Sequence, residues 1–193
     1  MRFEDLDKAV YRNIIHLFRR FSEDPAIFWT EADVASHLYS LLINDPAFEK
    51  SIAWFESASF PKKSKTLLVH VNAQDETKSK GKYYDLLILK PKKYLKDEID
   101  KDEEASVIGI EVKFDRRAPA RKEKSNIISD IKKVAKMRKG YVLWLNSGRK
   151  IGPEHLEKAK KLANRLGVKL LYLDLSSQCK ISPRTNVKEI NLR

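Results

Sequence analysis

Short apolar segments of strand length alternate with amphipathic helical segments along much of the chain. Residues 65–73, 83–89 and 106–114 have no helical segment between them, so we expect them to form an antiparallel three-strand meander. Residues 141–145 and 168–175 each follow a helical segment, and helical crossovers join parallel strands. The sequence therefore predicts an α/β fold built on a mixed sheet.

Apolar residues at helical spacing predict four helices. The first lies within residues 1–24, and the second begins after Thr30, which with Asp33 forms the pattern of a capping box. The other two cover residues 125–138 and 152–167, the latter with Pro153 in its first turn and a glycine just past its end. Residues 44–63 are ambiguous and are expected to form a short helix or an irregular segment.

The chain is expected to form a single domain. Its 193 residues fit one ordinary core, and the sequence has no internal repeat and no linker. We expect a core over roughly 30–145, preceded by the N-terminal helix of residues 1–24. An added helix and strand follow over 146–175, and then an irregular tail over 176–193. Residues 90–105 are first basic and then acidic without apolar period, so they predict an exposed excursion.

Charge and cysteine content restrict the classes of partner and compartment. The formal net charge is +12, which favours a polyanionic partner and above all nucleic acid. The single Cys179 excludes an intramolecular disulfide and a cysteine zinc cage, so we expect a reducing, cytoplasmic location. No apolar run approaches the roughly 20 residues that span a bilayer, so no membrane partner is expected.

The segment Ile108–Phe114 reads as a strand that carries two charges on one face. Side chains alternate along a strand, so Glu111 and Lys113 point to one side, and Ile110 and Val112 to the other. Asp85 lies near the start of an otherwise apolar strand that can pair with this one. Two converging carboxylates repel each other unless a cation lies between them, and the cation that such a pair usually binds is Mg²⁺ or Mn²⁺.

These residue types suit the chemistry of phosphodiester cleavage. Asp85 and Glu111 are the candidate metal ligands, and the Val112 carbonyl is a natural third ligand. Lys113 beside the ion is placed to orient a water nucleophile or to stabilise charge developing on a phosphate. The simpler interpretation of Glu111 and Lys113 is a weak charge pair on a solvent-facing side of the sheet.

Asp85 followed by Glu111-Val112-Lys113 resembles the PD-(D/E)xK signature of the restriction-endonuclease-like nucleases, with Tyr84 standing where the signature has proline. The resemblance covers roughly residues 30–145, and the predicted element order also fits that family's core. It implies a single nuclease-like domain and a metal-dependent deoxyribonuclease, an endonuclease that hydrolyses phosphodiester bonds of DNA with Mg²⁺ or Mn²⁺. Many members carry a glutamate on the helix before the first strand, and Glu31 fits that place. The implied catalytic set is therefore Asp85, Glu111, Lys113 and Glu31.

Basic residues follow directly after the candidate site. Such a cluster can neutralise a phosphate backbone, and an N-cap serine presents free amides that can bind a phosphate. The predicted nucleic-acid-binding residues are Arg116, Arg117, Arg121, Lys122, Lys124, Ser125, Lys132 and Lys133. Secondary candidates near Asp85 are Gln74 and His70.

Other functions remain open at this point. The same fold can bind nucleic acid without cutting it, as a binding module or as the subunit of a complex. A nucleotide-binding α/β domain is disfavoured, because the six glycines form neither a Walker A motif nor a dinucleotide-binding fingerprint. The sequence does not choose between DNA and RNA, between duplex, branched and single strands, or between a monomer and a homodimer.

Overall fold

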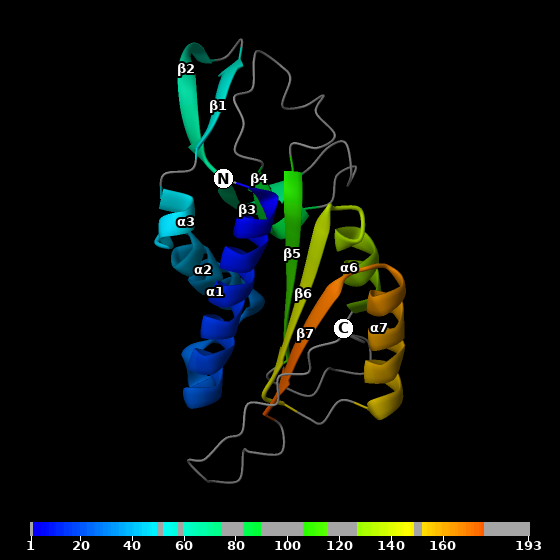
Figure 1. Cartoon of the computed structure of the whole chain (residues 1–193). Coiled ribbons are helices and arrows are strands. Elements are labelled where there is room, and N and C mark those ends of the chain that lie inside the picture. The colour runs from blue at the N-terminus through cyan, green and yellow to red at the C-terminus, as the bar shows by residue number, and fades with distance from the viewer. Residues whose placement is uncertain are drawn as a thin grey trace.

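The protein is an α/β structure with a five-stranded mixed sheet (Figure 1). The structure is a computed structural model, and it describes residues 2–49, 52–57, 60–74, 83–89, 106–115, 127–148 and 152–175. The elements are, in chain order, α1 Phe3–Glu23, η1 Pro25–Ile27, α2 Glu31–Ile43, α3 Pro46–Glu49, β1 Ile52–Ser57, β2 Phe60–Leu67, β3 Val69–Gln74, β4 Tyr83–Leu89, β5 Ser106–Asp115, α6 Ile127–Val134, β6 Lys139–Asn146, α7 Pro153–Arg165 and β7 Lys169–Asp174.

The main sheet has the strand order β3-β4-β5-β6-β7. β3, β4 and β5 pair antiparallel, as predicted, whereas β6 pairs parallel to β5 and β7 pairs parallel to β6. Helices α6 and α7 supply the two crossovers. The predicted α/β class and the predicted strand directions are thus confirmed.

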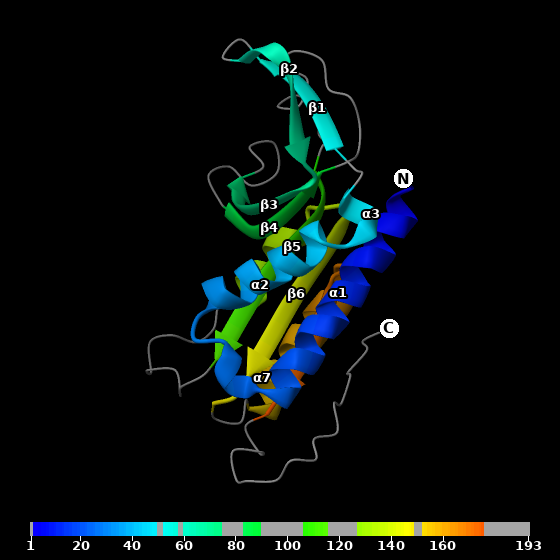
Figure 2. The ribbon, with the colours of Figure 1, turned by 90° about the vertical axis from the view of Figure 1, so that its left-hand side faces the viewer.

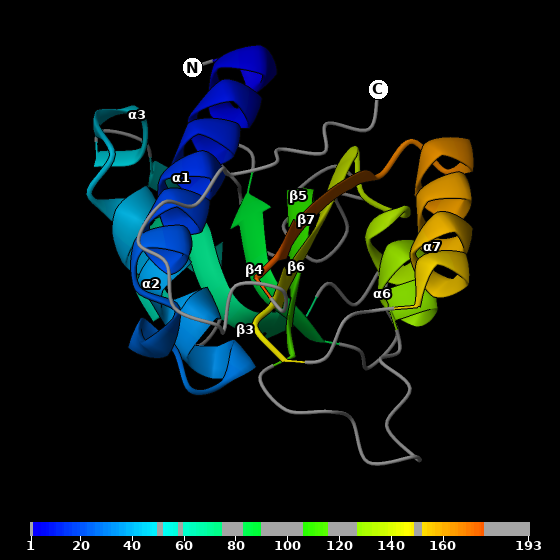
Figure 3. The ribbon, with the colours of Figure 1, turned by 90° about the horizontal axis from the view of Figure 1, so that it is seen from below.

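Helices cover both faces of the sheet. Seen from below, α1 and α2 lie on one side and α6 and α7 on the other (Figure 3). Each helix turns its apolar stripe toward the sheet, as with Ile14 and Leu17 on α1 and Leu38 on α2, all 0% exposed. The central strand β5 is consequently buried from Ser106 to Val112, which is the situation of a parallel-type sheet with helices on both sides.

A second, smaller sheet was not expected from the sequence. β1 and β2 pair antiparallel into a hairpin that projects beyond the end of the main sheet (Figure 2). The ambiguous segment 44–63 therefore holds the short helix α3 and most of this hairpin. Lysines at 62, 63 and 65 interrupt the apolar pattern of β2, which is why the pattern did not indicate a strand. The predicted strand 65–73 is divided at Leu68 between β2 and β3.

Among the described helices, none combines the length and the apolar character needed to cross a bilayer. The predicted exposed excursion over 90–105 and the tail over 176–193 lie outside the described residues.

The predicted capping box at the start of α2 is present. The Thr30 hydroxyl accepts a hydrogen bond from the Asp33 amide at 3.1 Å, and an Asp33 carboxylate oxygen accepts one from the Thr30 amide at 2.9 Å. The same carboxylate oxygen accepts the Trp29 amide at 3.0 Å. These bonds fix the first turn of α2, which is the turn that carries Glu31.

We expect Thr30→Ala to lower the free energy of unfolding by about 1 kcal/mol, because it removes the hydroxyl that accepts the Asp33 amide. Thr30→Ser keeps that oxygen and is the matched control. Urea denaturation of the parent and both variants measures the difference. Equal midpoints for Thr30→Ala and Thr30→Ser would show that the capping hydroxyl contributes nothing to stability.

Candidate functional site

Asp85 and Glu111 lie next to each other on neighbouring strands. Leu86 of β4 is opposite Ile110 of β5 in an antiparallel pair, and Asp85 precedes Leu86 whereas Glu111 follows Ile110, so the two acids stand beside each other. The Val112 amide donates a hydrogen bond to Asp85 Oδ2 at 2.7 Å. The Asp85 carboxylate is thus held against β5 between the positions of Glu111 and Lys113.

Glu111 is a buried acid, and only one of its two carboxylate oxygens has a partner among the described residues. Its side chain is 4% exposed, and Lys133 Nζ of α6 lies 2.6 Å from its Oε2 atom. Lys133 is itself held in place, because its Nζ also donates to the Tyr83 carbonyl at 2.8 Å. Within the described part of the chain, Glu111 Oε1 has no hydrogen-bond partner. A buried oxygen of this kind is a group that another donor or a cation can stabilise.

Lys113 lies between two acids that come from two different helices. Its Nζ donates to Glu31 at 3.3 and 3.4 Å and forms an ion pair with Asp130 Oδ2 of α6 at 3.5 Å. The amide of Phe114 donates to the same Glu31 oxygen, Oε1, at 3.4 Å. Glu31 is therefore fixed by a backbone bond as well as by the lysine, even though its side chain is 45% exposed.

Burial and crowding of like charges shift the titration of this cluster. Burial, together with the negative charge of Asp85, raises the pKa of Glu111 to about 8. Burial also raises the pKa of Glu31 and of Asp130. For Lys113 burial acts to lower the pKa, but the charges of Asp130 and Glu31 outweigh it and the pKa is raised. Lys113 is consequently an ammonium ion at neutral pH.

The charge of the cluster is unbalanced. Four carboxyl groups, those of Glu31, Asp85, Glu111 and Asp130, share two ammonium groups, those of Lys113 and Lys133. If every group were ionised, two negative charges would be left without a partner inside the cluster. An added cation would relieve that excess, and so would a proton on Glu111.

The acids do not converge on one point as they stand. Among the residues that the structure describes, no three His, Cys, Asp or Glu side chains are grouped so that they could hold a metal ion. Each acid instead has a partner. Asp85 accepts a hydrogen bond from the Val112 amide, and Glu111 pairs with Lys133. Glu31 and Asp130 both pair with Lys113. Asp85 and Glu111 are the two acids that lie side by side on neighbouring strands.

The structure brings together all four acidic and basic residues that the sequence singled out for catalysis, Asp85, Glu111, Lys113 and Glu31. The solvent-facing interpretation of the Glu111–Lys113 pair is wrong, because α6 covers that face and Glu111 is buried. Glu31 is the first residue of α2, and it reaches Lys113 of β5.

Two members of the cluster escaped sequence reasoning. Asp130 is 7% exposed and lies on the inward stripe of α6 with Ile127, Ile131 and Val134, so its spacing was a usable signal. Lys133 was expected on a nucleic-acid-binding surface, but its side chain is 15% exposed and is engaged by Glu111. No local pattern distinguishes it from its exposed neighbour Lys132.

The remaining basic candidates are divided between described and undescribed residues. Lys132 is exposed on α6. The residues that precede α6 lie outside the described part of the chain, namely Arg116, Arg117, Arg121, Lys122, Lys124 and Ser125. His70 of β3 is opposite Leu87 of β4, and burial lowers its pKa. The backbone of Gln74 ends β3, and its side chain lies outside what the structure describes.

Comparisons with protein-family models, with curated proteins and with solved structures find no match for this chain. What can be said of function therefore rests on the residues and their geometry. That geometry is a buried, acid-rich cluster with a charged lysine at its centre.

We expect the free energy of unfolding to fall as the pH rises from about 5 to about 8. The folded protein keeps the Glu111 proton until its pKa of about 8, whereas the unfolded chain loses it near 4.5. Unfolding therefore releases a proton in this window, and a single such group changes the stability by up to about 1.4 kcal/mol per pH unit.

Glu111→Gln should flatten this dependence, because the amide resembles the protonated acid and cannot ionise. Glu31 and Asp130 act in the same direction, so a smaller slope remains. Denaturant unfolding at a series of pH values measures it, with the exposed Glu157→Gln as control. A slope identical in the parent and in Glu111→Gln would show that Glu111 does not titrate in this range.

Proposed function

We propose that this protein is a metal-dependent nuclease that hydrolyses phosphodiester bonds of nucleic acid, with DNA as the substrate. The observation that carries the proposal is the placement of Asp85 beside Glu111 and Lys113 on adjacent strands, with Glu31 reaching Lys113 from α2. This is the arrangement that the PD-(D/E)xK resemblance implies for a catalytic site.

The order of elements supports the same proposal. In the restriction-endonuclease-like core, a helix precedes an antiparallel three-strand meander, and a second helix then leads to a parallel strand. Here α2, the strands β3 to β5, α6 and β6 follow in that order and with those strand directions. The helix α1 and the pair α7 and β7 are additions to this core.

The residues of the site fit a hard divalent cation such as Mg²⁺ or Mn²⁺. Asp85 and Glu111 supply carboxylate oxygens, Glu111 Oε1 is buried with no partner among the described residues, and the cluster carries excess negative charge. We assign Asp85, Glu111 and the Val112 carbonyl as the groups that would hold the ion. When bound, such an ion supplies an activated water and polarises a phosphate oxygen.

Lys113 is the group that would act on the reacting phosphate. Its side chain is 19% exposed, so it keeps some access to solvent, and its raised pKa keeps it charged. A fixed positive charge in a partly buried site stabilises negative charge that develops on phosphate oxygens. Glu31 and Asp130 hold its Nζ from two sides and so position it without themselves touching the phosphate.

One observation favours a second candidate function, a nucleic-acid-binding module that does not cut. Lys133 already neutralises Glu111 at 2.6 Å, and no three-acid group stands ready for a metal in the described part of the chain. A cluster that supplies its own cations can be structurally stable without an ion. The two candidates differ in whether metal binds at Asp85 and Glu111.

We expect the parent to cleave DNA only in the presence of Mg²⁺ or Mn²⁺. Asp85→Ala and Glu111→Gln should lose this activity while keeping the fold, because each removes a ligand rather than packing. Lys113→Ala should lower the turnover rate by a factor on the order of 10² or more. Cleavage of plasmid, branched and single-stranded DNA measures the activity.

The control for these variants is Lys160→Ala, which removes a lysine of α7 that pairs with its helix neighbour Glu157. It should cleave like the parent. A parent that binds DNA yet cuts none of the three substrates would favour the non-cutting module. Variants that cut as well as the parent would show that the assigned residues are wrong.

We also expect Mg²⁺ or Mn²⁺ to raise the thermal unfolding midpoint of the parent, because an ion that binds only the folded state stabilises it. The increase should vanish in Glu111→Gln and in Asp85→Ala. Thermal unfolding at increasing metal concentration measures it without any requirement for activity. An equal increase in the parent and in both variants would place the ion elsewhere.

A further inference from the structure

A groove of about 460 Å³ lies between α6 and α7, on the side of α6 that faces away from Glu111. Figures 1 and 3 show these two helices side by side over the same face of the sheet. Six residues line the groove: Ile128, Lys132, Lys158, Lys161, Leu162 and Arg165. Four of them are cations, two are aliphatic, and none is an acid.

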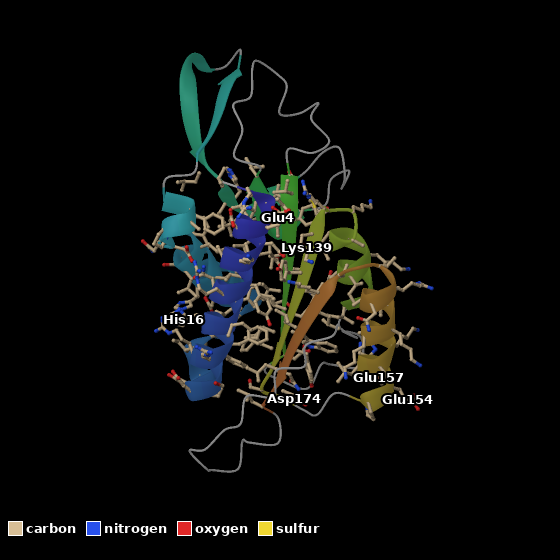
Figure 4. The ribbon with its side chains drawn as sticks, viewed as in Figure 1. Glu4, His16, Lys139, Glu154, Glu157 and Asp174 are labelled. Carbon is tan, nitrogen blue, oxygen red and sulfur yellow. The ribbon has the colours of Figure 1, made fainter. Side chains whose placement is uncertain are left out.

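The four cations of this groove are available to a ligand. Lys132, Lys158, Lys161 and Arg165 are exposed, and none of them forms an ion pair with another described residue. The nearby Lys160 is different, because it pairs with Glu157 at 3.1 Å. Figure 4 shows Glu154 and Glu157 near the beginning of α7, one helical turn before Lys158 and Lys161, and among the described residues no ion pair joins these acids to the two lysines.

The spacing of the cations matches a linear polyanion. Lys158, Lys161 and Arg165 are three and four residues apart, so they follow one face of α7. At the rise of an α-helix they span about 10 Å, which is about three phosphate-to-phosphate intervals of one strand, at roughly 3.4 Å each along the axis of a DNA duplex. Lys132 adds a fourth charge from α6, across the groove.

The groove is separate from the candidate catalytic cluster but close to it. Lys133 reaches Glu111, whereas its neighbour Lys132 lines the groove, so α6 presents one lysine to each side. The two regions therefore lie on different sides of the same helix. A nucleic acid positioned at the cluster has its backbone within reach of the groove.

We infer that the α6–α7 groove binds the phosphodiester backbone of a nucleic acid, as a second contact surface outside the catalytic cluster. The inference rests on the proposed function for the identity of the ligand, a nucleic acid, and it does not require that the protein cleaves that ligand. The groove contributes affinity and orientation, because contacts to phosphates position a nucleic acid without reading its sequence. It takes no part in the chemical step.

The experiment compares two double variants that remove the same charge. One variant combines Lys161→Gln and Arg165→Gln and so removes two of the four cations of the groove. The other combines Lys8→Gln and Arg19→Gln and removes two exposed cations of α1, which lies on the opposite side of the sheet. Affinity for a short DNA duplex is measured without metal ions across a series of salt concentrations, so cleavage does not interfere. Far-ultraviolet circular dichroism confirms that both variants are folded.

We expect the groove variant to lose affinity on the order of 10-fold and its logarithmic salt dependence to become shallower by about 2, one for each lost phosphate contact. The α1 variant should bind within about twofold of the parent, since long-range charge effects are screened by salt. Equal losses in the two variants would overturn the inference, because they would reflect net charge alone. An acidic polypeptide that competes as well as DNA would also overturn it, in favour of a protein partner.

Failure of this inference is distinguishable from failure of the proposed nuclease function. If the parent cuts DNA and the groove variant binds like the parent, the groove inference is wrong and the nuclease stands. If the groove variant loses binding and the parent cuts nothing with metal, the groove stands and the nuclease is wrong.

Discussion

The burial of charged groups inside the central strand β5 is the constraint on which the candidate site depends. β5 is paired on both edges and covered by helices on both faces, so the Glu111 side chain is only 4% exposed. A buried charge without a partner is costly, and removing one member of a buried pair typically costs about 3–5 kcal/mol. Glu111 and Lys113 therefore need partners from neighbouring elements, and α2 and α6 supply them.

The two partner helices are positioned by tight local interactions. The capping box fixes where α2 begins and thus where Glu31 lies. On the other side, a β-carbon at Gly140 would lie 2.6 Å from the carbonyl oxygen of Val134, the last residue of α6. Only glycine allows β6 to start this close to the end of α6. That close approach keeps α6 against β5, with Asp130 near Lys113 and Lys133 at Glu111.

The helix α6 separates two regions of opposite charge. Its inner side faces an acid-rich cluster that holds more carboxyl groups than ammonium groups. Its outer side contributes to a groove lined by four cations. Cations and protons are drawn to the first region and polyanions to the second. Under the proposed function, the outer side would hold the backbone of a nucleic acid and the inner side would bind the metal ion.

The sequence by itself determined the α/β class, the strands β4 to β7, the four main helices, the capping box and the four residues Glu31, Asp85, Glu111 and Lys113. The elements, the capping box and the shared strand face of Glu111 and Lys113 follow from periodicity, capping chemistry and alternation, which are properties of short segments, whereas Glu31 was singled out by the resemblance to the PD-(D/E)xK signature. Only the tertiary structure decided which partners the charges have. Asp130 and Lys133 face Lys113 and Glu111 because a crossover brings α6 back onto β5, and the α6–α7 groove exists because two helices pack side by side. Such contacts join residues distant in sequence, so no local pattern specifies them.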